Sequence, residues 1–516
     1  WNGLTIAYKL GNSNRNYVLT RWMMTTRRRA GVLLHPTSLP GSGGIGSFGT
    51  ELTTFLDFLV KADFSLWQVL PLTPPAAGNS PYSAYSAFAG NHLLIDLQQL
   101  VAEGDLSPQA LTNTHPDDHV AFEQVTPWKE ALLHTAAENF FNQGQTPRLQ
   151  EFWHFCDTTY WLHDYALFRA LKQHYQHKPW HRWPSDLAFR KPAALEQASV
   201  KLGPEIGVQK YLQWQFFRQW QQVRGAARER GIAIIGDLPI FVAHDSADVW
   251  CNQELFLLDD KGKPTVVAGV PPDYFSATGQ LWGNPLYDWK AMAQQGYSWW
   301  IARFRQMFDL FDQVRIDHFR GFEAAWHVPA AAKTAIRGSW VPGPGSHFFD
   351  AVNNVLGALP FIAEDLGIIT PEVEALRDRY NLPGMKILQF AFDSDAANPY
   401  LPHNHLPNSV VYTGTHDNDT TKGWFSSLPA KTINRMYEYL GLSGAEPVQD
   451  LIKVALMSVA QTAIIPLQDL LELPTGARMN QPGVALGNWS WRYQVGQLTP
   501  ELAKQYARLV KLYGRN

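Results

Sequence analysis

The chain has 516 residues, of which 17% are charged and 13% are aromatic, and its formal net charge is −3. This balance provides no positive field for phosphate backbones, so we expect no nucleic-acid partner. No apolar run approaches the ~18 residues of a membrane span, so we expect no membrane partner either. Two cysteines, Cys156 and Cys251, are too few for a disulfide framework and fit a reducing compartment.

The first 29 residues differ from the rest of the chain. They contain no Asp or Glu and end in three arginines, a composition found in some organelle transit peptides. The Met23-Met24 pair suggests instead that translation starts there, and we favour this interpretation. We therefore treat residues 1–29 as a disordered or non-native leader and residues 30–516 as the catalytic region. The expected location is the cytoplasm, or a plastid only if the leader is a genuine transit peptide.

Short apolar runs predict the strands of the fold. Residues 98–230 are rich in Gln, Ala, Leu and Trp at helical spacing, which predicts a mainly helical insertion. Outside it, eight apolar runs lie near residues 66, 94, 235, 315, 362, 387, 411 and 464. Helical stretches separate most of these runs. Strand-then-helix alternation at this count predicts an α/β fold, a (β/α)₈ TIM barrel with helical insertions in its βα loops.

A second insertion is expected at about residues 245–300. Within it, residues 267–289 carry Pro271-Pro272, several aromatics and two Asp, which is too much turn chemistry for a helix or a strand. This segment is typical of a lid or a binding loop. Another long loop follows residue 72, and its polar and aromatic side chains are available to a ligand. They include Ser80 and Tyr82.

The stretch QVRIDHFRG at 313–321 joins a short apolar strand to ionisable residues. Arg315 and Asp317 are two residues apart, so in an extended segment their side chains point the same way. A neighbouring guanidinium favours the ionised carboxylate, which is the form that a nucleophile needs. An isolated R-x-D of this kind is more often a structural ion pair. Two similar stretches downstream, IAEDLG and GTHDND, favour a functional interpretation.

The polar residues follow the third, fourth, fifth and seventh apolar runs, and in a barrel that face carries the active site. They are Asp237, Arg315, Asp317, His318, Glu364, Asp365, His416, Asp417, Asn418 and Asp419. Several acids in one pocket repel each other, which raises the pKa of one and leaves another ionised. An ionised and a protonated carboxyl in an aromatic cleft suit glycosidic bond exchange. No metal or other cofactor is expected, since metal-ligand spacing is lacking and Arg315 would repel a cation.

These motifs resemble those of the 4-α-glucanotransferases of glycoside hydrolase family 77, from about Gly31 to Tyr513. The similar stretches are RIDHFRG, IAEDLG, GTHDND, GVLLHPTSLPG, SPYSAYSAFAGN and GVPPDYFSATGQLWGNPLYDW. The resemblance implies a retaining enzyme that transfers a 1,4-α-D-glucan segment to the 4-OH of an acceptor through a covalent glycosyl-enzyme. Its substrates would be maltooligosaccharides and α-1,4-glucans, and we favour a monomer.

By motif match, Asp317 would be the nucleophile, Glu364 the acid/base and Asp417 the transition-state stabiliser. Other matched positions would bind substrate, and the first three of them would hold the sugar in the −1 subsite. These positions are Arg315, His416, Asp237, Ser80, Tyr82, Asp273, Tyr274, Phe275, Trp282, His318 and Asn480. Two alternatives stay open: an α-amylase-type hydrolase with the same triad, and a catalytically silent glucan-binding protein.

Overall fold

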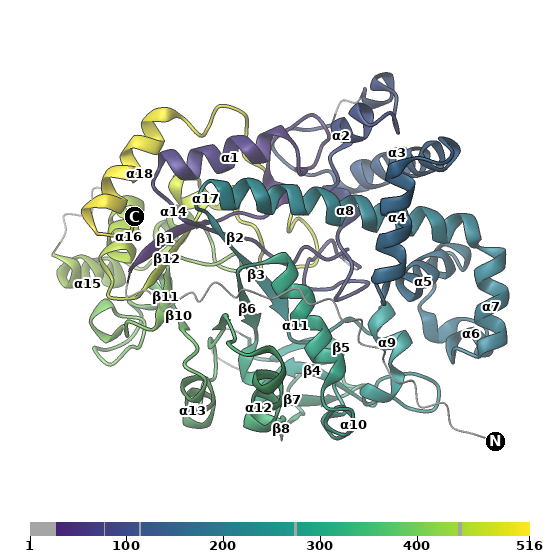
Figure 1. The fold of residues 1–516 in the computed structure, drawn as a ribbon. Helices are drawn as coiled ribbons and strands as arrows, with labels where there is room; N and C mark the ends of the chain where they lie inside the picture. The colour runs from purple at the N-terminus through teal and green to yellow at the C-terminus, as the bar shows by residue number, and fades with distance from the viewer. Residues whose placement is uncertain (1–26, 77, 113–114, 273–275, 442–445) are drawn as a thin grey trace.

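The computed structural model describes residues 27–76, 78–112, 115–272, 276–441 and 446–516. Eight parallel strands form a nearly closed barrel at the centre of the molecule (Figure 1), in the order β10-β11-β12-β1-β2-β3-β6-β9. The Ala363 N–H donates to the Pro383 carbonyl at 2.9 Å and so links β9 to the residue before β10. The predicted (β/α)₈ barrel is confirmed.

The barrel strands are short and almost wholly buried, as expected for parallel strands that are covered on both faces. They are β1 (Arg29–Leu33), β2 (Leu66–Gln68), β3 (Ala233–Pro239), β6 (Gln313–Asp317), β9 (Phe361–Ala363), β10 (Gly384–Ile387), β11 (Ser409–Tyr412) and β12 (Thr462–Pro466).

The strand predicted near residue 94 is wrong. Residues His92–Leu94 form a 3-10 helix, and α2 (Leu97–Ala102) follows it. The side chains of Asn91 and Asp96 each accept a backbone N–H and cap these two helices, whereas a short apolar run alone does not separate strand from helix. The remaining barrel strand is β1, which begins at Arg29, inside the segment that the sequence analysis assigns to the leader.

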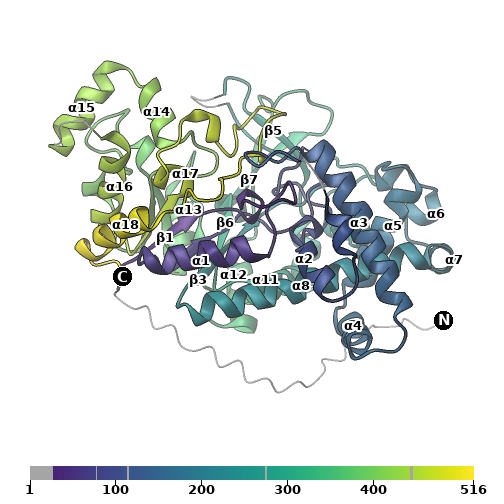
Figure 2. The same ribbon diagram turned by 90° about the horizontal axis from the view of Figure 1, so that it is seen from above.

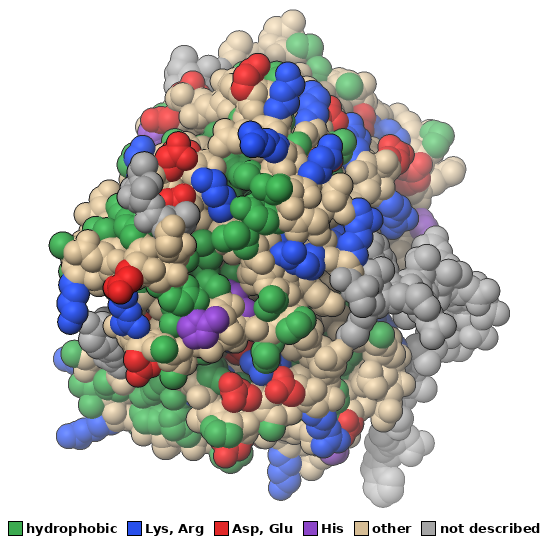
Figure 3. Space-filling model, turned by 90° about the vertical axis from the view of Figure 1, so that its left-hand side faces the viewer, with side chains coloured by type: hydrophobic (Ala, Val, Ile, Leu, Met, Phe, Trp, Pro, Cys, Tyr) green, Lys and Arg blue, Asp and Glu red, His purple; other side chains and the backbone are tan. Residues whose placement is uncertain are grey.

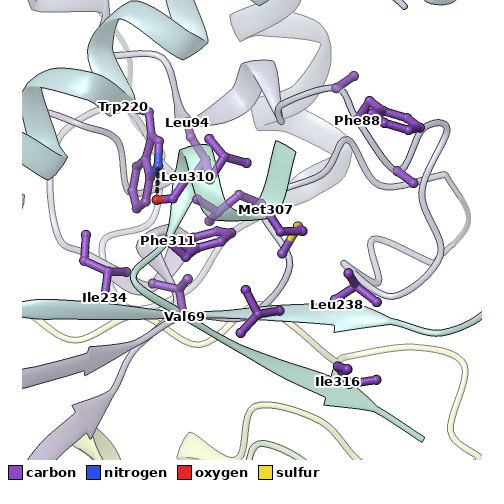
Figure 4. Packing of buried hydrophobic residues seen from close by; sticks show 14 of the residues in the cluster. Val69, Phe88, Leu94, Trp220, Ile234, Leu238, Met307, Leu310, Phe311 and Ile316 are labelled. Atoms are coloured by element: carbon purple, nitrogen blue, oxygen red, sulfur yellow. Dashed lines mark hydrogen bonds between the residues drawn. The ribbon is translucent and has the colours of Figure 1, made fainter. Parts of the chain in front are cut away.

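Helices fill the connection between β2 and β3 and lie together on one side of the barrel in both ribbon views (Figures 1 and 2). After α2 they are α3 (Phe122–Asn142), α4 (Pro147–Thr158), α5 (Leu162–His174), α6 (Ser185–Ala188), α7 (Pro192–Lys201) and α8 (Gly203–Glu229). The long helix α8 joins this group to the barrel. Its Trp220 is fully buried, and the indole N–H donates to the Leu310 carbonyl at 3.0 Å (Figure 4).

The other helices surround the barrel or follow its strands. They are α1 (Thr50–Lys61), α9 (Ala247–Cys251), α10 (Trp289–Gln294), α11 (Ser298–Leu310), α12 (Gly345–Leu356), α13 (Pro371–Arg379), α14 (Thr421–Ser427), α15 (Ala430–Leu440), α16 (Pro447–Met457), α17 (Leu467–Leu470) and α18 (Pro500–Leu512). Helices α14 to α16 lie on the opposite side of the barrel from α3 to α7 (Figures 1 and 2).

A second, antiparallel sheet has the strand order β5-β4-β7-β8. Its strands are β4 (Val266–Val270), β5 (Gln280–Pro285), β7 (Ala324–Pro329) and β8 (Ser339–Pro342). The prediction that residues 267–289 contain no strand is therefore wrong. Pro271 and Pro272 lie in the connection between β4 and β5, where they interrupt no strand hydrogen bond.

The surface bears both signs of charge. Acidic and basic side chains are interspersed with apolar ones on the face shown in Figure 3. Among the described residues, no helix combines the length and the apolar character that crossing a membrane requires.

Candidate functional site

The side chains predicted to carry the chemistry come from neighbouring barrel strands. In β3 and β6, Asp237 is the register partner of Arg315. In β6 and β9, Ile316 is the partner of Ala363, so the next residues along these parallel strands are Asp317 and Glu364. The ladder continues to this point, since the Glu364 N–H donates to the Ile316 carbonyl at 3.0 Å.

Arg315 lies between two carboxylates in the buried part of the site. Its Nη1 is 2.8 and 2.9 Å from the two carboxylate oxygens of Asp237, and 3.1 Å from Oδ1 of Asp317. The Asp237 side chain is 0% exposed and also accepts the hydroxyl of Tyr82 at 2.7 Å. Burial alone would lower the pKa of Arg315, but the two carboxylates outweigh burial and raise it well above its usual value.

Glu364 is held by backbone donors. Its Oε2 accepts the His318 N–H at 2.6 Å, and its Oε1 accepts the Leu366 N–H at 3.1 Å. His318 has a left-handed backbone with φ of 52°, a conformation that non-glycine residues adopt at turns. This turn, directly after β6, aims the His318 amide at the end of β9 and so fixes the Glu364 carboxyl beside Asp317.

The pKa values of Asp317 and Glu364 both lie above their ordinary range. Burial is the main cause for each carboxyl, and Arg315 opposes it at both. The negative charges of Asp237 and Glu364 raise the pKa of Asp317 further. The expectation that Arg315 alone keeps Asp317 ionised is therefore corrected: the contact is present, but burial and like charge outweigh it. The pair can hold a proton near neutral pH.

Aromatic rings enclose His416, which follows β11. The Tyr82 ring stacks on it with centroids 5.0 Å apart and an interplanar angle of 14°, and the Trp489 ring lies 5.9 Å away. Burial lowers the pKa of His416, although the charge of Asp417 acts in the opposite direction. A neutral, buried imidazole packed against two aromatic rings is suited to hydrogen bonding with a neutral ligand such as a sugar.

Asp417 is the most open of the three predicted catalytic carboxyls, with a side chain that is 48% exposed. Its Oδ1 accepts the side-chain N–H of Asn480 at 2.6 Å and lies 3.4 Å from Nε2 of His416. The loop after β11 and the segment containing Asn480 thus fix this carboxyl together.

Two further predicted residues lie at the same end of the barrel. Trp282, on β5, has 38% of its surface exposed, and its ring meets the His318 ring edge-on at 4.7 Å. The hydroxyl of Ser80 instead forms a hydrogen bond within its own loop, where it accepts the Tyr82 N–H at 3.3 Å. The predicted binding residues Asp273, Tyr274 and Phe275 lie outside the described residues.

Some acids at the strand ends are structural. Asp365 forms an ion pair with Arg377 and accepts the backbone N–H of Met385. Asp419 accepts the N–H of Thr420 and the hydroxyl of Thr475. These contacts tie both side chains into the fold.

Sequence reasoning missed three residues that contact the site. Trp489 packs on Tyr82 and His416, Arg478 donates to the Asp417 carbonyl, and the Met385 sulfur accepts Nε of Arg315 at 3.4 Å. The stretches RMNQPG and GNWSWR, which contain Arg478 and Trp489, were the signal available in the sequence. Across the described ranges, no group of three or more His, Cys, Asp or Glu side chains is arranged to hold a metal ion.

Carboxyls, a guanidinium and aromatic rings at the carboxyl ends of parallel barrel strands define the active site of a (β/α)₈-barrel enzyme. Comparison with known proteins identifies the kind of enzyme. Residues 34–499 match the protein family described as 4-alpha-glucanotransferase. The chain therefore belongs to the 4-alpha-glucanotransferase family, glycoside hydrolase family 77, and is an enzyme of the glycosyltransferase type.

Individual relatives agree with the family match. The chain is 51% identical to a 4-alpha-glucanotransferase of Synechocystis sp., over 95% of this chain and 99% of the relative. It is 48% identical to a chloroplastic/amyloplastic 4-alpha-glucanotransferase of Solanum tuberosum, over 95% and 87%. Its fold matches the amylomaltase from Streptococcus agalactiae in complex with acarbose, with a TM-score of 0.93 and 38% identity, over 95% of this chain and all of that one.

Proposed function

We propose that the chain transfers a segment of a 1,4-α-D-glucan to the 4-OH of an acceptor glucose or glucan by a retaining double displacement. Asp317 attacks the anomeric carbon while Glu364 protonates the departing oxygen, so that the glycosidic bond breaks and an ester to Asp317 forms. Glu364 then takes the proton of the acceptor hydroxyl, which displaces Asp317. Asp417 stabilises the positive charge that develops on the sugar in both steps.

The observation that carries this proposal is the register of β6 and β9. Asp317 and Glu364 directly follow the paired residues Ile316 and Ala363, and the backbones of adjacent strands are ~4.8 Å apart. Retaining enzymes have their two carboxyl groups ~5–5.5 Å apart, whereas inverting enzymes leave ~6.5–9.5 Å for a water. Residues directly across a strand pair suit the retaining distance.

The electrostatics of the pair support the division of roles. Two carboxyls with raised pKa values share a proton near neutral pH, which is the state that a nucleophile and an acid require together. Arg315 contacts Asp317 directly at 3.1 Å and favours the ionised form of that carboxyl, although it opposes protonation of Glu364 as well. We assign the proton to Glu364, because the proposed mechanism needs an acid beside an ionised nucleophile.

The binding roles follow from the position of each side chain. Arg315, Asp237 and His416 would hold the sugar in the −1 subsite. Tyr82 would help to position two of these side chains, because it donates to Asp237 and stacks on His416. Asn480, Trp282 and His318 would contact the flanking sugars, and Ser80 would act through the backbone of Tyr82. The family match and the acarbose-bound Streptococcus agalactiae amylomaltase support maltooligosaccharides and α-1,4-glucans as the substrates.

The product profile from pure maltotriose tests this function against the hydrolase alternative. Transfer yields glucose together with maltooligosaccharides longer than the substrate, whereas hydrolysis yields glucose and maltose alone. The family match favours transfer and gives no support to hydrolysis or to a silent glucan-binding protein. Maltotriose cleaved without any longer product would contradict the proposal.

Acceptor choice depends on positioning a sugar hydroxyl and excluding water, since both acceptors are hydroxyls and water is far more concentrated. We assign this task to the loop that contains Asp273, Tyr274 and Phe275. Tyr274→Ala or Phe275→Ala should raise the hydrolysis-to-transfer ratio on maltotriose, mainly by slowing transfer. Two folded variants with the parental ratio would show that this loop does not control acceptor choice.

The location and the oligomeric state are also proposed. The free thiols of Cys156 and Cys251 support a reducing compartment, for which we propose the cytoplasm. We propose a monomer, and light scattering of the purified chain would check this directly.

A further inference from the structure

A short segment beyond the barrel strands lies against the loop that carries Asp417. It runs from Arg478 to Asn480, and we call it the 478–480 segment. Two of its hydrogen bonds come from Asn480, whose N–H donates to the His416 carbonyl at 3.0 Å and whose side chain donates to Oδ1 of Asp417 at 2.6 Å. Asn480 therefore contacts the backbone and the carboxylate of the same loop.

Arg478 adds two further hydrogen bonds to this arrangement. Its Nη2 donates to the Asp417 carbonyl at 2.5 Å, and its Nε donates to the Asn480 carbonyl at 2.6 Å. One planar guanidinium thus holds the backbone of Asp417 and the backbone of the residue that binds the Asp417 carboxylate. A rigid fork of donors can bridge two acceptors in this way, whereas a single point charge cannot.

No ion pair between Arg478 and a carboxylate occurs among the described residues. Charged donors make shorter and stronger hydrogen bonds than neutral ones, so both bonds restrain the backbone effectively. Asp417 needs this restraint, because its own N–H makes a long 3.3 Å bond to the Thr415 hydroxyl and its side chain is 48% exposed.

We propose that Arg478 is a positioning residue: it holds the Asp417 carboxylate at the place where positive charge develops on the reacting sugar. This inference rests on the proposed role of Asp417 as the transition-state stabiliser. A stabiliser acts more strongly on the transition state than on the bound substrate, so its misplacement lowers kcat and leaves KM nearly unchanged. Displacement by about 1 Å costs up to about 100-fold in rate.

The first experiment measures glucose release from maltotriose by Arg478→Ala. We expect kcat to fall by about 10- to 100-fold while KM stays within about twofold. Arg478→Lys should recover part of the rate, because an ammonium reaches one of the two carbonyls but cannot hold both. Arg228→Ala is the matched control, since Arg228 is an exposed arginine on α8 and should keep the parental kcat and KM.

The second experiment places the same change in an Asp417→Ala background. If Arg478 acts only through the Asp417 carboxylate, Arg478→Ala should cost less than about twofold there, so that the two losses are not additive. Equal factors in both backgrounds would overturn the proposal, as would parental kcat in Arg478→Ala. A parallel rise in KM would also overturn it by indicating a general structural role.

The role of Asp417 and the positioning role of Arg478 can be refuted separately. If Asp417→Ala keeps the parental rate, the proposed role of Asp417 is wrong, whatever Arg478 does. If Asp417→Ala is severely impaired and a folded Arg478→Ala is not, only the positioning role is wrong. Should Arg478→Ala not fold, Arg478→Lys decides the matter: a lowered kcat at constant KM supports the proposal, and a parental kcat refutes it.

Discussion

The charge of Asp237 should control the pH at which Asp317 becomes active. Asp237 is fully buried, and its negative charge is among the causes that raise the pKa of Asp317. Asp237→Asn removes that charge and keeps the shape of the side chain. The pKa of Asp317 then falls. Since a nucleophile must be ionised, the acidic limb of the pH–rate profile moves to lower pH.

The size of this effect follows from the geometry. Oxygens of Asp237 and Asp317 both lie within 3.1 Å of Nη1 of Arg315, so they are at most about 6 Å apart. At an effective dielectric constant of ~20, like charges at this distance repel by about 3 kcal/mol, or about 2 pH units. The Asp317 side chain is 29% exposed, and solvent screening lowers this value. We expect the limb to move down by about 1 pH unit.

The assay is kcat/KM for maltotriose between pH 4 and pH 9 in the parent and in Asp237→Asn. The overall rate should fall as well, because Asp237 is proposed to bind the sugar. A lower maximal rate does not change the pH at which the acidic limb has its midpoint. Tyr82→Phe is the matched control: it removes the other hydrogen bond to Asp237 without changing any charge. A limb that stays in place in Asp237→Asn would refute the electrostatic reasoning.

Three further predictions concern stability, acceptor choice and metal. Burial lowers the pKa of Lys129 to about 7, while an unfolded lysine titrates near 10.5, so the parent gains stability as the pH rises through this window. Urea unfolding should show about 2 kcal/mol more gain between pH 7 and pH 9 for the parent than for Lys129→Met; equal gains would contradict this. Trp282→Ala should raise the hydrolysis-to-transfer ratio, because Trp282 lies exposed beside His318, and an unchanged product profile would exclude this role. Exhaustive chelation should leave the transfer rate intact, whereas loss with recovery on added calcium would reverse the no-metal expectation.

The fold was readable where burial leaves a strong pattern. Apolar runs around Ile235 and Ile316 identified barrel strands because parallel strands are covered on both faces. The apolar run at His92 led to a wrong strand prediction, because its length suits a strand or a helix. The residue that decides for a helix is the capping Asn91, which lies outside the run. Strand β1 was obscured by the three arginines at 27–29, the last of which begins the strand, and β4 and β5 were obscured by the prolines between them.

The site was readable where it depends on strand ends. Asp317 and Glu364 follow apolar runs directly, so the barrel topology alone brings them together. Arg478 and Trp489 come from a segment more than 60 residues after Asp417, and only tertiary packing brings them to it. The raised pKa of Asp317 was likewise beyond local reasoning, because the adjacent arginine is visible in the sequence and the burial is not.

The most direct test of the proposed chemistry is capture of the glycosyl-enzyme. In Glu364→Gln the acid/base is absent, and α-maltotriosyl fluoride supplies a leaving group that needs no proton, so the ester should form and persist. Intact-protein mass spectrometry should show one added maltotriosyl unit, and peptide mapping should locate it on Asp317. An adduct on Asp417, or fluoride release with no adduct at any time point, would contradict the assignment of Asp317 as the nucleophile.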